Sequence, residues 1–114
     1  MECQKAAGVY AIVNTHNGKV YIGSAVNIHK RFHEHKHHLR HNNHHSPRLQ
    51  HSYNKHGKET FEYQVMQYCS VSELREVEQS YLDNTQSYLP THGYNIARVA
   101  AGGRREILSA DQLQ

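Results

Sequence analysis

Two tyrosines stand ten residues apart, in the tripeptides Gly8-Val9-Tyr10 and Tyr21-Ile22-Gly23. A phenolic hydroxyl can take up or pass on a proton. With an ordinary pKa of about 10, it is a poor base unless a cation or a basic side chain lies beside it. Tyrosines on paired strands can equally be half-buried residues of a sheet. Their chemistry therefore depends on which charged groups share their cleft.

Arg31 and His35 are four residues apart, so on a helix they lie on one face. A guanidinium group offers a planar fork of donors that suits phosphate oxygens, and an imidazole beside it can share a proton or donate to the phosphate. Considered alone, the pair is also typical of the surface of a basic helix.

One glutamate is predicted to point toward the core. On a helix over residues 70–84, with about 100° per residue, Glu78 falls about 40° from the centre of the apolar arc, whereas Glu76 falls on the opposite, solvated side. Burying an unpaired carboxylate is costly, so Glu78 needs a partner: an ion pair with Arg31 or Arg75, or a hard cation such as Mg²⁺. The arc consists of Leu74, Val77, Tyr81 and Leu82.

Histidine is the unusual component of the composition. Ten of the twelve histidines lie between His29 and His56. His33, His37 and His41 recur every four residues, a spacing that suits a transition metal on a helix. Because no cysteine or carboxylate stands at ligand spacing in this run, a solvated, weakly basic face is favoured over a dedicated metal site.

The elements that must position these residues can be read from turn and capping signals. Alternating apolar residues predict strands over 8–15, 19–24 and 59–68, with Asn17-Gly18 as the turn of a hairpin. Three helices are predicted from their caps: Asn27 to about His41, Ser46 to Gly57, and Ser70 to about Asn84. The chain is therefore expected to be an α+β domain with a small three-stranded antiparallel-type sheet flanked by helices.

Length and charge restrict the class of protein. The 114 residues fit one domain, and neither a span of about 20 apolar residues nor a signal-peptide core is present, so a soluble, intracellular, cytoplasmic protein without a membrane partner is expected. Residues 1–58 carry nine lysines and arginines against Glu2 and Glu34. This excess of positive charge indicates a polyanionic partner.

The order of these motifs resembles the GIY-YIG nucleases, over about residues 8–97. Within that family, the stretches "YIGSAVNIHKRFHEH" and "LQHSYNKHG" are most similar to intron-encoded homing endonucleases of the phage or bacterial type. The resemblance implies hydrolysis of double-stranded DNA with one Mg²⁺ ion, for which Mn²⁺ can substitute, leaving a 5′-phosphate and a 3′-hydroxyl.

The resemblance also implies roles for single residues. Tyr10 is the expected proton acceptor, Tyr21 orients water or phosphate, and Glu78 holds the metal. An asparagine in the "GYN" segment braces the site by hydrogen bonds, and a histidine before the second helix, either His44 or His45, takes part. The expected catalytic residues are Tyr10, Tyr21, Arg31, His35, Glu78 and Asn95.

Two other functions are compatible with parts of the sequence. One is a histidine-rich protein that binds transition metals. The other is a DNA-binding module derived from a nuclease, although no motif position carries an inert residue.

We expect residues 1–97 to form the catalytic domain, and residues 98–114 to be a flexible tail that begins a linker to absent DNA-binding modules. The affinity of this chain for DNA should therefore be weak and strongly salt-dependent.

Overall fold

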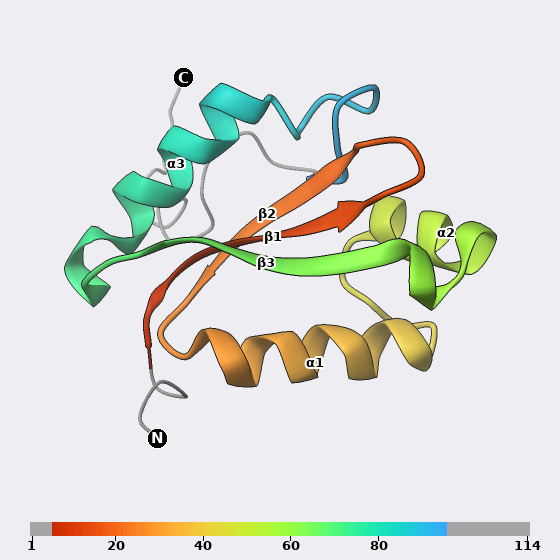
Figure 1. Cartoon of the computed structure of the whole chain (residues 1–114), viewed down its shortest axis with the longest axis horizontal. Helices are drawn as coiled ribbons and strands as arrows, with labels where there is room; N and C mark the ends of the chain where they lie inside the picture. Colours follow the sequence, from red (N-terminus) through yellow and green to blue (C-terminus); the bar gives the residue numbers. More distant parts are fainter. Residues whose placement is uncertain (1–5, 96–114) are drawn as a thin grey trace.

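Three antiparallel strands form one sheet in the order β2-β1-β3 in a computed structural model that describes residues 6–95 (Figure 1). The predicted α+β fold is confirmed. Along the chain the elements are β1 (Gly8–Asn14), β2 (Val20–Ala25), α1 (Ile28–Arg40), α2 (Pro47–His56), the 3₁₀ turn η2 (Lys58–Thr60), β3 (Phe61–Tyr68), the 3₁₀ turn η3 (Val71–Glu73) and α3 (Leu74–Thr85).

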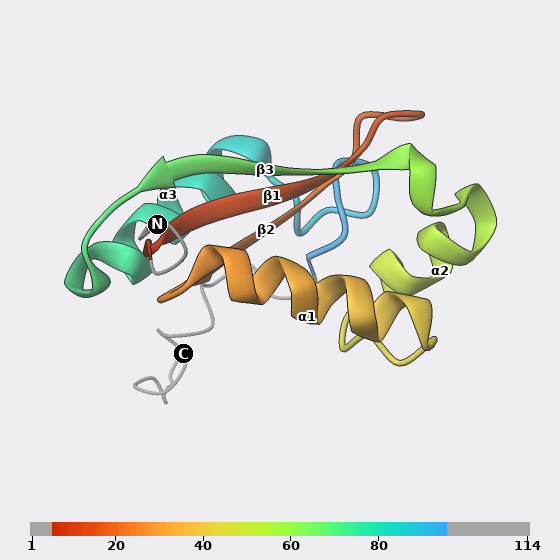
Figure 2. The same cartoon turned by 60° about the horizontal axis from the view of Figure 1, so that its bottom comes forward.

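The sheet carries a separate apolar cluster on each face. Side chains alternate along a strand, so Tyr10 and Ile12 of β1 pack with residues of α1 and α2, while Val9 and Ala11 pack on the other face with Leu82 of α3. Figure 1 shows α3 above the sheet and α1 below it, and in Figure 2 α1 again lies below the strands. A residue of β2 therefore contacts either α1 or α3, depending on its position in the alternation.

Capping residues set the helix boundaries as the sequence predicts. The side chain of Asn27 accepts a hydrogen bond from the Lys30 amide at the start of α1, and Ser46 accepts one from Leu49 at the start of α2. Gly57 ends α2 with φ of 93°, a conformation that favours glycine. The third helix differs from the prediction, because the capping box at Ser70 closes the 3₁₀ turn η3 and the α-helix begins only afterwards.

The segment after α3 runs along the outer edge of β2. Gly93 forms a parallel bridge with Val20, and the Tyr94 amide donates to the Val20 carbonyl at 2.9 Å. None of the three predicted strands covers this segment. The predicted end of the domain at residue 97 and the tail over 98–114 lie outside the described residues. Within 6–95, no helix combines the length and apolarity needed to cross a membrane.

Candidate active site

The register of the β1–β2 hairpin places Tyr10 and Tyr21 on the same face of the sheet. Tyr10 lies opposite Gly23, and Tyr21 lies opposite Ile12, so the two tyrosines are diagonal neighbours that both face α1. Their ring centroids are 5.4 Å and 5.6 Å from that of His35. The structure thus brings together three of the residues that the sequence singled out.

A chain of hydrogen bonds leads from the start of α2 to the Tyr10 hydroxyl. The Ser46 amide donates to Nδ1 of His44 at 2.9 Å, Nε2 of His44 is 2.7 Å from Nδ1 of His35, and Nε2 of His35 is 2.6 Å from the Tyr10 hydroxyl. Because Nδ1 of His44 accepts, a neutral His44 must carry its proton on Nε2 and donate to His35. His35 in turn carries its proton on Nε2 and donates to Tyr10. We call Ser46, His44, His35 and Tyr10 the histidine relay.

Burial keeps both imidazoles of the relay neutral. It lowers the pKa of His35 to about 2 and that of His44 to about 4, with further lowering by neighbouring positive charges. Burial also raises the pKa of Tyr10 well above its usual range, and the nearby Arg31 guanidinium opposes this rise. A hydrogen bond donated to the phenol oxygen favours its charged form, so the relay acts in the same direction as Arg31.

The loop between α1 and α2 gives His44 and His45 different positions. The His44 amide donates to the side chain of Gln50 at 3.0 Å, and this side chain also donates to the Leu39 carbonyl, so His44 is held inside the protein. His45 is exposed, and its Nε2 lies 2.7 Å from the Tyr21 hydroxyl. His44 is therefore linked to the Tyr10 hydroxyl through His35, whereas His45 lies directly at the Tyr21 hydroxyl.

His35 lies behind Tyr10 and does not reach the surface. Only 2% of the residue is exposed, and each ring nitrogen contacts a member of the relay. The expectation that His35 shares a proton with a neighbour fits this position. A direct hydrogen bond from His35 to phosphate does not, because neither nitrogen is left to make one.

Arg31 carries an unused donor at the wall of a pocket. Its Nη1 donates to Glu34 at 3.1 Å, whereas its Nε is buried and has no hydrogen-bond partner in the part of the chain that the structure describes. The pocket, of about 520 Å³, is lined also by Ser24 and Lys30. A buried donor without a partner is rare in folded proteins, and at a pocket wall it is suited to an anionic ligand.

Glu78 is buried, as the helical periodicity predicts, and Glu76 is exposed. The Ser24 hydroxyl donates to Oε1 of Glu78 at 2.5 Å. Burial raises the pKa of Glu78, while this hydrogen bond and the charge of Arg31 lower it. No ion pair joins Glu78 to Arg31 within 6–95, since the guanidinium pairs with Glu34 instead. Ser24 is not among the residues predicted for the site, although strand alternation places it on the α3 face with Ile22.

Asn95 braces β2 from outside the sheet. Its amide group donates to the Ile22 carbonyl at 2.9 Å and accepts from the Ile22 amide at 2.8 Å, as a neighbouring strand would. The Ser87 hydroxyl also donates to Asn95, at 2.6 Å. Asn95 therefore fixes the strand that carries Tyr21 and Ser24, and it acts through the backbone.

The model of the GIY-YIG catalytic domain matches residues 6–95. The chain belongs to the GIY-YIG family. It is 37% identical over 98 residues to intron-associated endonuclease 1 of Enterobacteria phage T4, a match that covers 84% of this chain and 39% of the relative. The chain thus spans about two fifths of the length of that curated protein.

Two solved structures share this GIY-YIG fold. One is the catalytic domain of homing endonuclease I-TevI, with a TM-score of 0.74 and 36% identity over 80% of this chain and 98% of that one. The other is a glutamate-to-alanine variant of the catalytic domain of intron endonuclease I-TevI, with a TM-score of 0.76 and 35% identity over 83% of this chain and 97% of that one. The chain therefore holds a GIY-YIG catalytic domain of the homing-endonuclease type.

GIY-YIG nucleases are generally metal-dependent, and the donor groups of this domain fit one hard cation. Glu78 offers a buried carboxylate that, within residues 6–95, accepts one hydrogen bond at Oε1 and none at Oε2. Among residues 6–95 there is no group of three or more His, Cys, Asp or Glu side chains placed to hold a metal ion. A single carboxylate suits an ion that keeps most of its water ligands, which is typical of Mg²⁺.

The histidine stripe does not form such a group either. His33 and His37 of α1 and His41 at its C-cap are exposed, and the ring centroids of His37 and His41 are 4.3 Å apart. Nothing in the described part of the chain completes a transition-metal site around them. The relay uses the buried His35 and His44 instead, which do not belong to the stripe.

Proposed function

We propose that this domain is a Mg²⁺-dependent DNA endonuclease of the homing type, active also with Mn²⁺, that hydrolyses phosphodiester bonds of double-stranded DNA to a 5′-phosphate and a 3′-hydroxyl. The observation that carries the proposal is the histidine relay, because it aims a donated hydrogen bond at the oxygen of a tyrosine beside Arg31. A tyrosine that only filled a core would need no such chain of neutral imidazoles.

Tyr10 accepts the proton of the attacking water, and Arg31 stabilises the charge of the phosphate. A water oxygen forms a bond to phosphorus while its proton passes to the Tyr10 oxygen. For this, Tyr10 first releases its own proton to solvent, and the N–H of His35 and the charge of Arg31 favour the resulting phenolate. The bond from phosphorus to the 3′ oxygen breaks, and that oxygen leaves as a hydroxyl after taking a proton from a solvent water. Arg31, with its unused Nε donor, stabilises the additional negative charge on the phosphate.

Glu78 would hold the metal ion, and Ser24 would keep the carboxylate in place. When bound, the ion supplies positive charge that activates water and polarises the phosphate. Ser24, the partner of Glu78, lines one pocket with Arg31, and the charge of Arg31 lowers the pKa of Glu78, so we place the cation and the phosphate together at this pocket. Tyr21, with His45 beside it, orients water or phosphate, and Asn95 keeps β2 in register.

The substitution Glu78→Gln tests the proposal most directly. It keeps size and hydrogen bonding but removes the charge that a hard cation needs, so plasmid cleavage in Mg²⁺ should fall at least about 100-fold while DNA binding persists. Glu76→Gln is the matched control, because Glu76 is exposed on the same helix. Equal cleavage by Glu78→Gln and the parent, with folding checked by circular dichroism, would exclude the single-metal site.

A triple substitution of His33, His37 and His41 separates this function from transition-metal binding. We expect the triple variant to cut more slowly, mainly because positive charge around the substrate is lost, but to retain its Mg²⁺ dependence. If the parent cuts no DNA tested, and if the triple substitution abolishes a tight uptake of Zn²⁺, the histidine-rich alternative would replace the proposal.

A further inference from the structure

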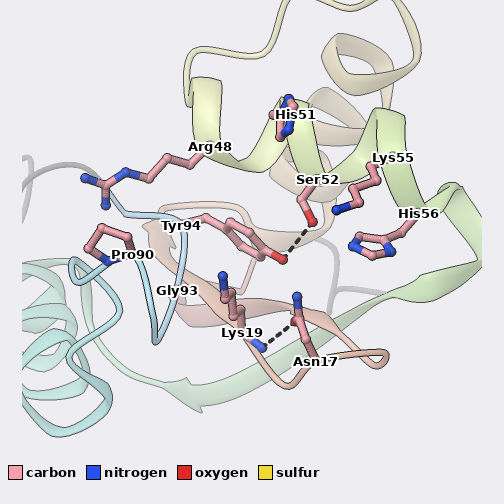
Figure 3. Close-up of a pocket in the computed structure, with 10 residues that line it drawn as sticks. All are labelled: Asn17, Lys19, Arg48, His51, Ser52, Lys55, His56, Pro90, Gly93 and Tyr94. Atoms are coloured by element: carbon pink, nitrogen blue, oxygen red, sulfur yellow. Dashed lines mark hydrogen bonds between the residues drawn. The ribbon is translucent and has the colours of Figure 1, made fainter.

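A second pocket lies between the β1–β2 hairpin and α2, and the proposed chemistry does not use it. Its volume is about 310 Å³, and its lining includes Lys19 from the hairpin, His51, Lys55 and His56 from α2, and Tyr94 from the segment along β2. We call it the hairpin pocket. Figure 3 shows Lys55 and His56 projecting from α2 on one side, Asn17 and Lys19 of the hairpin below, and Tyr94 on the other side with its hydroxyl at Ser52.

The hairpin pocket is electropositive and contains no counter-charge. No aspartate or glutamate is among its lining residues. The ammonium groups of Lys19 and Lys55 and the ring of His51 have no hydrogen-bond or ion-pair partner within 6–95. Burial lowers the pKa of His56, and the positive charges nearby lower it further. Uncompensated cations gathered at one concave surface favour an anionic ligand.

The floor of the hairpin pocket is rigid. The Tyr94 hydroxyl accepts a hydrogen bond from Asn14 at 2.9 Å and lies 2.8 Å from the Ser52 hydroxyl. The Tyr94 carbonyl accepts from the Ser46 hydroxyl at 2.9 Å. Ser46 belongs to the histidine relay, so a ligand on this floor is held at a fixed position relative to Tyr10.

The shape and chemistry of the hairpin pocket fit a sugar-phosphate segment. Lysine and histidine donors can bind phosphate oxygens, and the exposed ring of Pro90 offers apolar surface for a deoxyribose. Half to two thirds of the hydrogen bonds in protein–DNA complexes go to phosphate and sugar, and such contacts fix the register of the protein on the duplex.

We propose that the hairpin pocket binds a backbone phosphate of DNA outside the scissile bond, through Lys19 and Lys55, and thereby sets the register of the duplex over Tyr10. The inference rests on the proposed function only in taking DNA as the ligand. The hairpin pocket would contact the DNA backbone and no bases, so its contribution to affinity should be the same for all DNA sequences.

Two double variants with the same charge change test the proposal. Lys19→Gln/Lys55→Gln removes the cations of the hairpin pocket, and Lys36→Gln/Lys58→Gln removes two cations from a different pocket, which Glu59 also lines. Binding of a labelled duplex of about 30 base pairs is measured by fluorescence anisotropy in EDTA at salt from about 50 to 200 mM. We expect Lys19→Gln/Lys55→Gln to bind about tenfold more weakly at low salt, with a salt slope lower by about two.

The Lys36→Gln/Lys58→Gln control distinguishes a phosphate site in the hairpin pocket from a general effect of positive charge on DNA affinity. Equal losses of affinity in the two double variants, or no loss in the first, would overturn the proposal. The measurement needs no metal and no cleavage, so a parent chain that binds but does not cut would refute the proposed function and leave this test intact.

NMR of the His51 and His56 rings separates DNA from small anions. We expect the duplex to shift these signals at concentrations where inorganic phosphate and a mononucleotide do not, because one phosphate lacks the additional contacts of the duplex. Saturation of the shifts by inorganic phosphate or the mononucleotide, with no shift from the duplex, would identify the pocket as a small-anion site and would overturn the proposal.

Discussion

Gly23 on β2 lies directly opposite Tyr10 on β1, and the Tyr10 ring fills the space that a side chain at position 23 would occupy. A Cβ atom there would lie 2.5 Å from Cζ of Tyr10, far inside contact distance. The glycine that ends Tyr21-Ile22-Gly23 therefore allows the Tyr10 ring to lie across β2, with its hydroxyl at His35.

The substitution Gly23→Ala should accordingly displace Tyr10. We expect the free energy of unfolding to fall by about 1–3 kcal/mol and cleavage to be lost, because overpacking moves the hydroxyl away from His35. A double-mutant cycle with Tyr10→Leu isolates the contact, since leucine lacks the ring atoms involved. The cost of Gly23→Ala, measured by urea unfolding, should nearly vanish in the Tyr10→Leu background, and an equal cost in both backgrounds would contradict this account.

The substitution Tyr10→Phe should abolish cleavage without unfolding the protein. It keeps the ring and leaves the N–H of His35 without its acceptor, so stability should fall by about 1–3 kcal/mol. Tyr63→Phe is a suitable control, because Tyr63 is a half-buried tyrosine on β3. Cleavage rates in Mg²⁺ should differ by orders of magnitude between the two variants, and an active Tyr10→Phe would remove Tyr10 from the mechanism.

Arg31 is expected to act through the geometry of its donors as well as through its charge. Arg31→Ala and Arg31→Lys should both lose most cleavage, because an ammonium group lacks the planar fork. Glu34→Gln should leave stability within about 1 kcal/mol, since the ion pair is half-exposed, and should release Nη1 for substrate. If Arg31→Lys cleaved at the parent rate, charge alone would account for the role of this residue.

The elements of this domain could be predicted because their signals are local. Asn27, Ser46 and Ser70 cap helices from within a few residues, and the hairpin follows from Asn17-Gly18 and the flanking alternation. The burial of Glu78 also follows from local periodicity. The resemblance to the GIY-YIG nucleases then supplied the candidate roles.

The partners of the site residues could not be predicted, because they depend on contacts far apart in sequence. Asn95 pairs with Ile22 across 73 residues, and Ser24 reaches Glu78 across 54. The choice between His44 and His45 depends on how Gln50 holds the loop between two helices, which no periodicity encodes. Strand alternation predicts the face of the sheet on which a side chain lies. Which residue it contacts there depends on how the helices pack.

The relay should make stability depend on pH. The folded-state pKa values of His35 and His44, about 2 and 4, lie below the about 6.5 of an unfolded histidine, so between about pH 4 and 6.5 the unfolded chain binds more protons. Stability is then complete above about pH 6.5 and falls as the pH drops, by up to about 1.4 kcal/mol per pH unit for each imidazole.

Urea unfolding between about pH 7.5 and 5 measures this effect. His35→Gln should flatten the dependence, whereas His33→Gln, at an exposed position of the same helix, should retain that of the parent. The raised pKa of Glu78 acts in the opposite direction in a lower range, because its folded form binds a proton more readily. A parent whose stability did not decrease below about pH 6.5 would contradict the neutral relay.

Ser24 should control how tightly the domain uses its metal ion. Its hydroxyl holds Oε1 of Glu78 and lowers the pKa of the carboxyl, so Ser24→Ala should leave the carboxylate less well oriented and more easily protonated. Removing a group that orients a metal ligand typically costs about 10–100-fold in metal affinity or activity. We therefore expect Ser24→Ala to need a higher Mg²⁺ concentration for half-maximal cleavage, with most of the rate recovered at saturating Mg²⁺. Ser80→Ala, at an exposed position of α3, should leave the Mg²⁺ titration unchanged. A titration of Ser24→Ala that overlays that of the parent would show that Glu78 is positioned without Ser24.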